Sequence, residues 1–174
     1  MSIFDKGGVF MFSAITISLR IANWLNWLFD ALLMVTLSAI VGDWAGLGTM
    51  VFTRIEPATT HNAIRGYLFA MVVMMPPIIV AVHWILTRLA ALVGDTAMGH
   101  ALTDANAARL RAIAWATLAI AIVDLCFGWV SVATGEYFGW SLSLTGWIAV
   151  PLLFVLAHIF REGAAMRADL EGTV

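Results

Sequence analysis

The sequence predicts an all-α, polytopic membrane protein, folded as a four-helix bundle made of two helical hairpins. Of its 174 residues, 62% are hydrophobic and only 11% are charged, whereas a soluble domain carries roughly 25% charged residues. The apolar residues fall into four stretches, at 21–44, 67–86, 112–133 and 140–160. Each stretch is close to the roughly 20 residues that cross a hydrocarbon core. A single cysteine excludes a disulfide framework, and a net charge of −2 gives no basic surface for direct binding of nucleic acid.

The first twenty residues form a separate N-terminal segment, 1–20. Lys6 and the apolar run after it resemble a secretion signal, but no small-residue cleavage site follows, and Arg20 stands where such a site would lie. Polar residues in this region recur at steps of three and four, so they share one face of a helix. We therefore expect 1–20 to be a helix on the cytoplasmic membrane interface or an N-terminal extension of the first span.

The first two spans contain residues that are rare in apolar helices. The first span contains Asp30, and the second contains Pro76 and Pro77 followed by His83. Each proline lacks a backbone N–H donor, so we expect the second helix to be kinked there.

The last two spans repeat this pattern. A helix capped by Thr103 or Asp104 is expected to lead into the third span, which contains Asp124. The fourth span contains Pro151, where a further kink is expected, and seven residues later His158, the same spacing as in the second span. Acid, proline and histidine thus occur twice in the same order. This order suggests two hairpins related by a pseudo-twofold axis along the membrane normal.

The basic residues predict the orientation of the spans. An even number of spans puts both termini on one side of the membrane. Two arginines lie in the first outer connection, 45–66, whereas seven basic residues lie on the side of the termini. These seven are Lys6, Arg20, Arg88, Arg109, Arg111, Arg161 and Arg167. The positive-inside rule therefore predicts cytoplasmic termini and a cytoplasmic tail at 161–174.

Four ionisable residues are predicted to form a polar network within the membrane: Asp30, His83, Asp124 and His158. A charged group at the bilayer centre costs about 2.5–3.5 kcal/mol on insertion scales, so these groups are expected to face the bundle interior and to pair. Three interpretations stay open. The network holds the bundle together, it responds to protons or ions, or His83 and His158 ligate a b-type haem.

No catalytic constellation is found in the sequence. There is no glycine-rich phosphate loop, no HExxH motif and no serine, histidine and aspartate in a plausible order. Cys126 lies in the third span without a basic neighbour and is interpreted as a small apolar residue. We therefore expect a protein that is not an enzyme and that holds no metal ion or cofactor apart from the haem alternative.

Two segments resemble a known family. They are 102–115, which precedes the third span, and 159–174, which follows the fourth. Both are similar to the YoaS-like bacterial family of unknown function (domain of unknown function two-nine-seven-five). In the N-terminal half the similarity extends only to the number of spans. The chain differs from the family at Leu102, where the family usually has an aromatic residue.

The resemblance implies a small four-helix protein in the lipid bilayer of the bacterial inner membrane, whose gene often neighbours a small Cro/CI-type helix-turn-helix regulator. It therefore implies a regulatory or sensory role exerted on that regulator through the inner loop and the tail. The candidate docking residues are Asn106, Arg109, Arg111, Arg161, Glu162, Met166, Arg167 and Leu170. The alternatives are a haem-binding redox protein and a small proton- or solute-coupled carrier that acts as a homo-oligomer.

Overall fold

The computed structural model describes residues 3–44, 58–134 and 143–171. Within these ranges the chain is helical apart from Ser143 and one turn, 98–103. The four helices are, in chain order, α1 (Ile3–Trp44), α2 (Ala58–Ala97), α3 (Asp104–Thr134) and α4 (Leu144–Glu171). The predicted all-α class is therefore confirmed.

All four helices contain a segment long and apolar enough to cross a membrane. These segments are Phe10–Ala39, Ala70–Ala97, Asp104–Ala133 and Leu144–Leu170. A chain with four such helices is a multi-pass membrane protein. The start of the predicted span 140–160 and most of the connection 45–66 lie outside the described residues.

The N-terminal segment is not a separate helix. Residues 3–20 run without a break into the first predicted span, and together they make the 42-residue helix α1. Prolines do not divide the later helices either. Helix α2 continues through Pro76 and Pro77, and α4 continues through Pro151.

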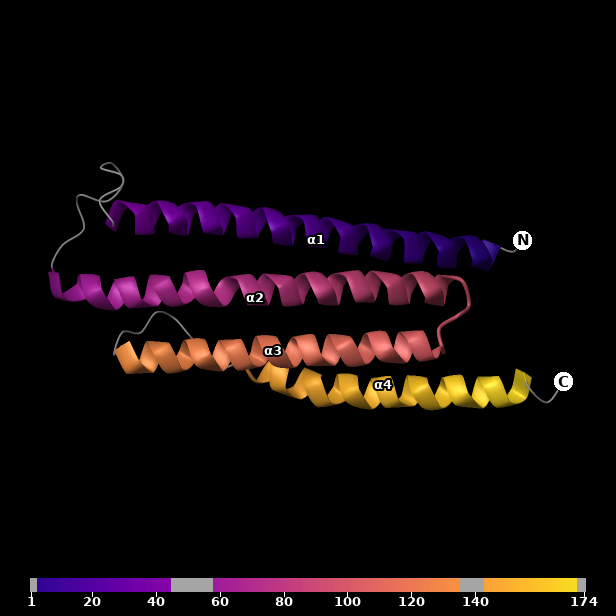
Figure 1. Ribbon diagram of the computed structural model, residues 1–174. Coiled ribbons are helices and arrows are strands. Elements are labelled where there is room, and N and C mark those ends of the chain that lie inside the picture. The colour runs from indigo at the N-terminus through magenta and orange to yellow at the C-terminus, as the bar shows by residue number, and fades with distance from the viewer. Residues whose placement is uncertain (1–2, 45–57, 135–142, 172–174) are drawn as a thin grey trace.

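The helices lie side by side in one layer, in the order in which they occur in the chain (Figure 1). Among the described residues only consecutive helices touch: α1 contacts α2, α2 contacts α3, and α3 contacts α4. The described helices therefore form an open layer and not a closed bundle, since α1 and α4 do not meet among them. Helix α2 packs on α3 as extensively as α1 packs on α2 and α3 packs on α4. The layer therefore does not separate into two hairpin units.

Helix α3 packs through a row of small residues. Ala107, Ala114, Ala121 and Gly128 are buried and follow one another at intervals of seven residues. A seven-residue repeat keeps one face of a helix against its neighbour, and small side chains let two backbones approach closely. On the α4 side, a Cβ added at Gly146 would lie 3.6 Å from the Cβ of Ala121. This contact places Gly146 of α4 level with Ala121 of α3.

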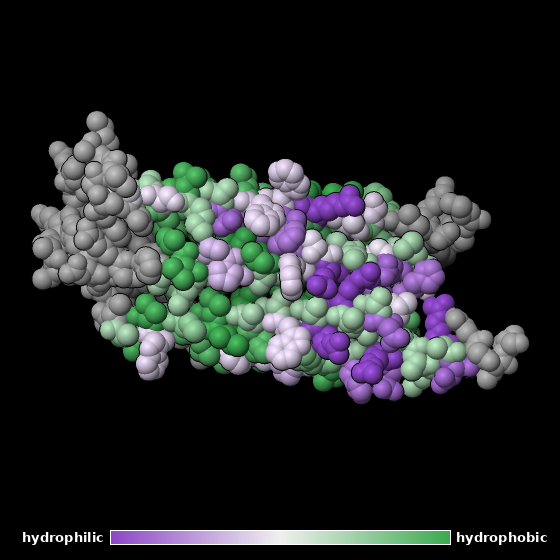
Figure 2. All heavy atoms as spheres, viewed as in Figure 1, coloured by the Kyte–Doolittle hydropathy of each residue, from purple (hydrophilic) through white to green (hydrophobic). Residues whose placement is uncertain are grey.

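Polar and apolar residues are separated along the layer. Figure 2 shows that hydrophilic residues gather at the end that holds the α2–α3 turn and the C-terminal part of α4, which we call the polar end. Most large side chains along the middle of the helices are apolar, and many are exposed, as at Leu32, Val132 and Leu152. A one-layer membrane protein exposes such side chains because lipid, rather than other helices, covers them.

Candidate functional site

The α2–α3 turn, residues 98–103, begins with a tightly bonded helix terminus. The backbone N–H of His100 donates to the carbonyl of Asp95 at 2.9 Å, and the N–H of Gly99 donates to the carbonyl of Thr96 at 3.0 Å. These two bonds are those of a Schellman motif, which requires a left-handed residue just after the helix. Gly99 fills that position with a φ of +80°, a conformation that costs other residues about 1–2 kcal/mol. The turn is therefore built to end α2 sharply.

Helix α3 begins at a side-chain cap. The hydroxyl Oγ1 of Thr103 accepts the backbone N–H of Asn106 at 3.2 Å, and the carbonyl of Thr103 accepts the N–H of Ala107 at 3.0 Å. Of the two caps expected from the sequence, Thr103 or Asp104, the structure selects Thr103.

Asn106 joins the turn to both neighbouring helices. Its side chain has no exposed surface. The amide Nδ2 donates to the carbonyls of His100 and Ala101, at 3.0 Å each, and Oδ1 accepts a hydrogen bond from Arg109 at 2.5 Å. Arg109 in turn forms an ion pair with Asp95 at the end of α2. From the sequence, Asn106 was a candidate docking residue. Because its side chain is buried, it holds the turn in shape instead.

The C-terminal part of α4 lies against the same turn. A Cβ added at Gly163 would lie 3.1 and 3.2 Å from the two methyl groups of Leu102. One helical turn further on, Nη1 of Arg167 donates to the carbonyl of Gly99 over 3.5 Å. The absence of a side chain at Gly163 thus lets α4 pack closely on the turn.

Other predicted docking residues do face outward at the polar end. Arg111, Arg161, Glu162, Met166 and Leu170 are all exposed. The exposed fractions are 63% for Met166 and 71% for Leu170, and the turn adds Met98 at 67%. Met98 was not singled out from the sequence because it belongs to no helical pattern.

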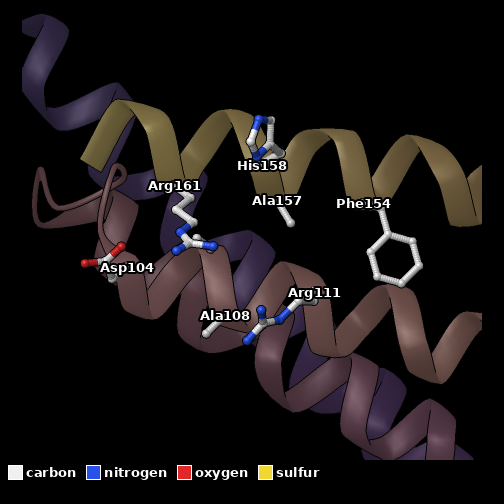
Figure 3. Close-up of a pocket in the computed structure, with 8 residues that line it drawn as sticks. Asp104, Ala108, Arg111, Phe154, Ala157, His158 and Arg161 are labelled. Atoms are coloured by element: carbon white, nitrogen blue, oxygen red, sulfur yellow. The ribbon is translucent and has the colours of Figure 1, made fainter. Parts of the chain in front are cut away.

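A groove lies between α3 and α4 at the polar end (Figure 3). Its volume is about 360 Å³. Two arginines, a histidine, an aspartate and four apolar residues line it: Arg111, Arg161, His158, Asp104, Ala107, Ala108, Phe154 and Ala157. The arginines and the histidine were singled out from the sequence, but their common groove was not, because it depends on the register of α3 and α4.

Within the membrane, His83 binds amide and indole groups of α1 and not an acid. Its Nδ1 lies 2.7 Å from Oδ1 of Asn23 and 3.2 Å from Nε1 of Trp27. The imidazole donates to Asn23 when Nδ1 carries the proton and accepts from Trp27 when it does not. One turn away, Nδ2 of Asn26 donates to the carbonyl of Ile79 at 3.1 Å. Asn23, Asn26 and Trp27 of α1 therefore all make polar contacts with α2.

The register of α1 and α2 explains why Asp30 does not reach His83. Asn23 lies opposite His83, and Asn26 lies opposite Ile79. Because the helices are antiparallel, Asp30 lies level with about Pro76, roughly 10 Å along α2 from His83. Oδ1 of Asp30 is buried and has no hydrogen-bond partner among the described residues. Asp30 and His83 therefore do not pair in this structure.

The two histidines lie at different depths. The Arg109–Asp95 contact places His83 level with about Ala121 on α3, and Ala121 lies against Gly146 of α4. His158 is twelve residues further along α4, so it lies about 18 Å nearer the polar end at 1.5 Å per residue. His158 is exposed there.

Because the two histidines lie at different depths, several expectations from the sequence fail. His83 and His158 stand on helices that do not touch among the described residues, so one chain cannot hold a haem between them. The sequence repeat does not give the two histidines equivalent places. Asp124, level with the start of α4, is about 20 Å from His158 along the helices. The four ionisable residues therefore do not form one network.

No cluster of three or more histidine, cysteine or acidic side chains that could hold a metal ion occurs within the described ranges. Cys126 is a free, exposed thiol on α3.

Comparison with known proteins gives one match. No curated protein and no solved structure shows significant similarity to the chain. Residues 50–174 match the model of a family described as "Protein of unknown function (DUF2975)". The match covers α2, α3 and α4, and with them the turn, the Thr103 cap and the α4 contact described above. The chain therefore belongs to this family of proteins of unknown function.

Proposed function

We propose that the chain is a bacterial inner-membrane protein with a regulatory or sensory role, and that its polar end binds a soluble helix-turn-helix regulator in the cytoplasm. The observation that carries this proposal is a set of exposed apolar side chains at the polar end. Met98, Met166 and Leu170 are each at least 63% exposed, at the end of the layer where hydrophilic residues gather (Figure 2).

The position of these side chains favours a docked protein rather than lipid. Met166 and Leu170 are one helical turn apart and lie beyond Arg161 on α4. Helix α4 continues for ten residues after Arg161, a length of about 15 Å. A positively charged residue marks the membrane edge, so these two side chains are expected to stand in water. Apolar side chains there that are flanked by charges are typical of helices that lie in a partner's groove.

The bonds around the turn supply the rigidity that such a surface needs. Asn106 and the Arg109–Asp95 ion pair hold the turn to α2 and α3. The contact between Leu102 and Gly163 holds α4 to the same turn. A surface held in one conformation before binding loses less entropy when a partner docks.

The open layer bears on the carrier alternative. A carrier needs a path that helices enclose, and the described helices of one chain form a single layer. A carrier would therefore require further copies of the chain, whereas docking at the polar end requires one.

Site-specific photo-cross-linking in cells tests the proposal. A photoreactive amino acid is placed at position 166 or 170, and a helix-turn-helix regulator from the gene neighbourhood is co-expressed. We expect cross-linking to the regulator from both positions. The matched control is position 152, because Leu152 is also exposed on α4, at 68%, but precedes Arg161 and lies within the span 140–160 predicted from the sequence. Absence of a cross-link at 166 and 170, or equal cross-linking at 152, would contradict the proposal.

A functional readout accompanies the cross-link. The double variant Met166→Glu and Leu170→Glu keeps α4 helical but places two charges on the docking surface. We expect it to change transcription from the regulator's promoter about as much as deletion of the whole protein does. Unchanged transcription alongside normal protein levels would show that the surface has no regulatory role.

A further inference from the structure

We infer that the groove between α3 and α4 binds the headgroup of an anionic phospholipid, with the phosphodiester held by Arg111 and Arg161. This inference concerns a lipid ligand and is independent of the regulator proposed above. It follows from three observations: the charge of the groove, the apolar wall that continues it into the membrane, and its place at the membrane edge.

The groove carries more positive than negative charge. Arg111 on α3 and Arg161 on α4 both line it, and Figure 3 shows Arg161 extending from α4 toward α3. Neither guanidinium pairs with a carboxylate within the part of the chain that the structure describes, whereas nearby Arg109 pairs with Asp95. Asp104 contributes one negative charge. The two arginines and Asp104 together contribute a formal net charge of +1, which matches the single negative charge of a phosphodiester.

The two arginines suit a phosphate in particular. A guanidinium presents several N–H donors in one plane and can bind two phosphate oxygens at once. The arginines come from two different helices, so a phosphate between them would be gripped from both sides. The start of α3 lies at the same groove through Asp104 and Ala107, and the positive end of its helix dipole adds to the attraction. Asp104 itself can accept hydrogen bonds from hydroxyl groups of a glycerol headgroup.

An apolar wall continues the groove toward the middle of the membrane. Phe154 lines the groove two helical turns before Arg161. Its ring packs edge to face on Trp115, with the ring centres 5.4 Å apart, and Trp115 is 59% exposed. Trp115 is one turn deeper on α3 than Arg111. An acyl chain can therefore lie on this aromatic pair while its headgroup reaches the arginines.

The membrane edge makes lipid the occupant, rather than a soluble anion. Basic pockets between transmembrane helices on the cytoplasmic side are typical sites for anionic headgroups. Lipid is present at this depth at high local concentration, and only a lipid uses both the arginines and the exposed Trp115–Phe154 pair. A free phosphate would use the arginines alone.

Native mass spectrometry of the full-length protein in detergent tests the assignment. The protein is titrated with phosphatidylglycerol and, separately, with phosphatidylcholine. We expect phosphatidylglycerol to bind at least tenfold more tightly. In the double variant Arg111→Gln and Arg161→Gln, binding of phosphatidylglycerol should weaken at least tenfold, since two charge-assisted contacts are lost. The charge-conserving variant with lysine at both positions should recover part of the affinity.

The control is Arg20→Gln, which removes an exposed arginine from α1, a helix without contact to α3 or α4 among the described residues. It should leave the affinity within twofold of the wild type. Each variant's thermal midpoint is measured without added lipid, so that loss of folding is distinguished from loss of binding. Equal binding of both lipids, or equal weakening by Arg20→Gln and by the double variant, would overturn the inference. Displacement of phosphatidylglycerol by millimolar inorganic phosphate would assign the groove to a soluble anion instead.

Discussion

Replacing Asn106 with alanine removes the side chain that holds the α2–α3 turn. Its amide makes two hydrogen bonds to backbone carbonyls, and its Oδ1 accepts one from the Arg109 guanidinium. A neutral hydrogen bond contributes about 0.5–1.5 kcal/mol and one to a charged group about 1.5–3 kcal/mol. Water can replace part of the lost hydrogen bonding at the two backbone carbonyls, because His100 is exposed. We expect Asn106→Ala to lower the free energy of unfolding by about 2–4 kcal/mol.

Chemical denaturation of the purified protein in detergent measures this loss. Protease cleavage within 98–103 gives a second, local readout, since a loosened turn is cut faster. Asn106→Asp separates the two kinds of contact. It keeps the acceptor for Arg109 but places a carboxylate oxygen against the carbonyls of His100 and Ala101, so it should destabilise the protein at least as much as alanine.

His100→Ala is the matched control, because it removes an exposed side chain while keeping the carbonyl that Asn106 binds. It should change the free energy of unfolding by less than about 0.5 kcal/mol, as surface substitutions do. If Asn106→Ala has an effect as small as His100→Ala, the turn is not held by Asn106 and the reasoning is refuted.

Three further predictions use the same denaturation assay. Gly99→Ala should lower the free energy of unfolding by about 1–2 kcal/mol, because the φ of Gly99 is +80°. Gly94→Ala, in open space within α2, should raise it by up to about 1 kcal/mol. Equal effects would contradict the Schellman motif at Gly99. Asp30→Asn should stabilise the protein, because Oδ1 of Asp30 is buried without a partner among the described residues; destabilisation would reveal a partner that needs the carboxylate. A double-mutant cycle between Asn23 and His83 should give a coupling energy of about 0.5–2 kcal/mol. The same cycle between Asp30 and His83 should give almost none. The reverse result would contradict the register of α1 and α2.

Apolar length and charge were enough to predict the four helices. Each span has about the length that a membrane requires, and that requirement acts on each helix separately. The Thr103 cap was also within reach, because capping depends on residues close together in sequence. The family resemblance rested on the segments around this cap and on the tail after Arg161.

The arrangement of the helices was out of reach for a physical reason. In lipid, an apolar side chain gains no hydrophobic free energy by facing another helix, so hydropathy does not tell which faces meet. The small residues that decide the α3–α4 contact, such as Ala121 and Gly146, are common in all four spans. A closed bundle was therefore as compatible with the sequence as the open layer.

The membrane histidines show the same limit. Matching Pro–His spacing suggested equal depths for His83 and His158, but depth depends on where each helix starts relative to its neighbour. Helix α4 extends past the α2–α3 turn (Figure 1), and this shift carries His158 to the polar end. Asn23 was visible as a polar residue on the face of α1, yet only the register identifies it as the partner of His83.

The most direct test of the account is the side of the membrane on which the polar end lies, because both proposals need it in the cytoplasm. In a Cys126→Ala background, single cysteines are placed at Asn62, Glu136, His100 and Arg167, and intact cells are treated with a membrane-impermeant maleimide. We predict labelling at positions 62 and 136 in intact cells, and at 100 and 167 only after the membrane is permeabilised. Labelling at 100 in intact cells, with 136 protected, would place the polar end outside and contradict the account.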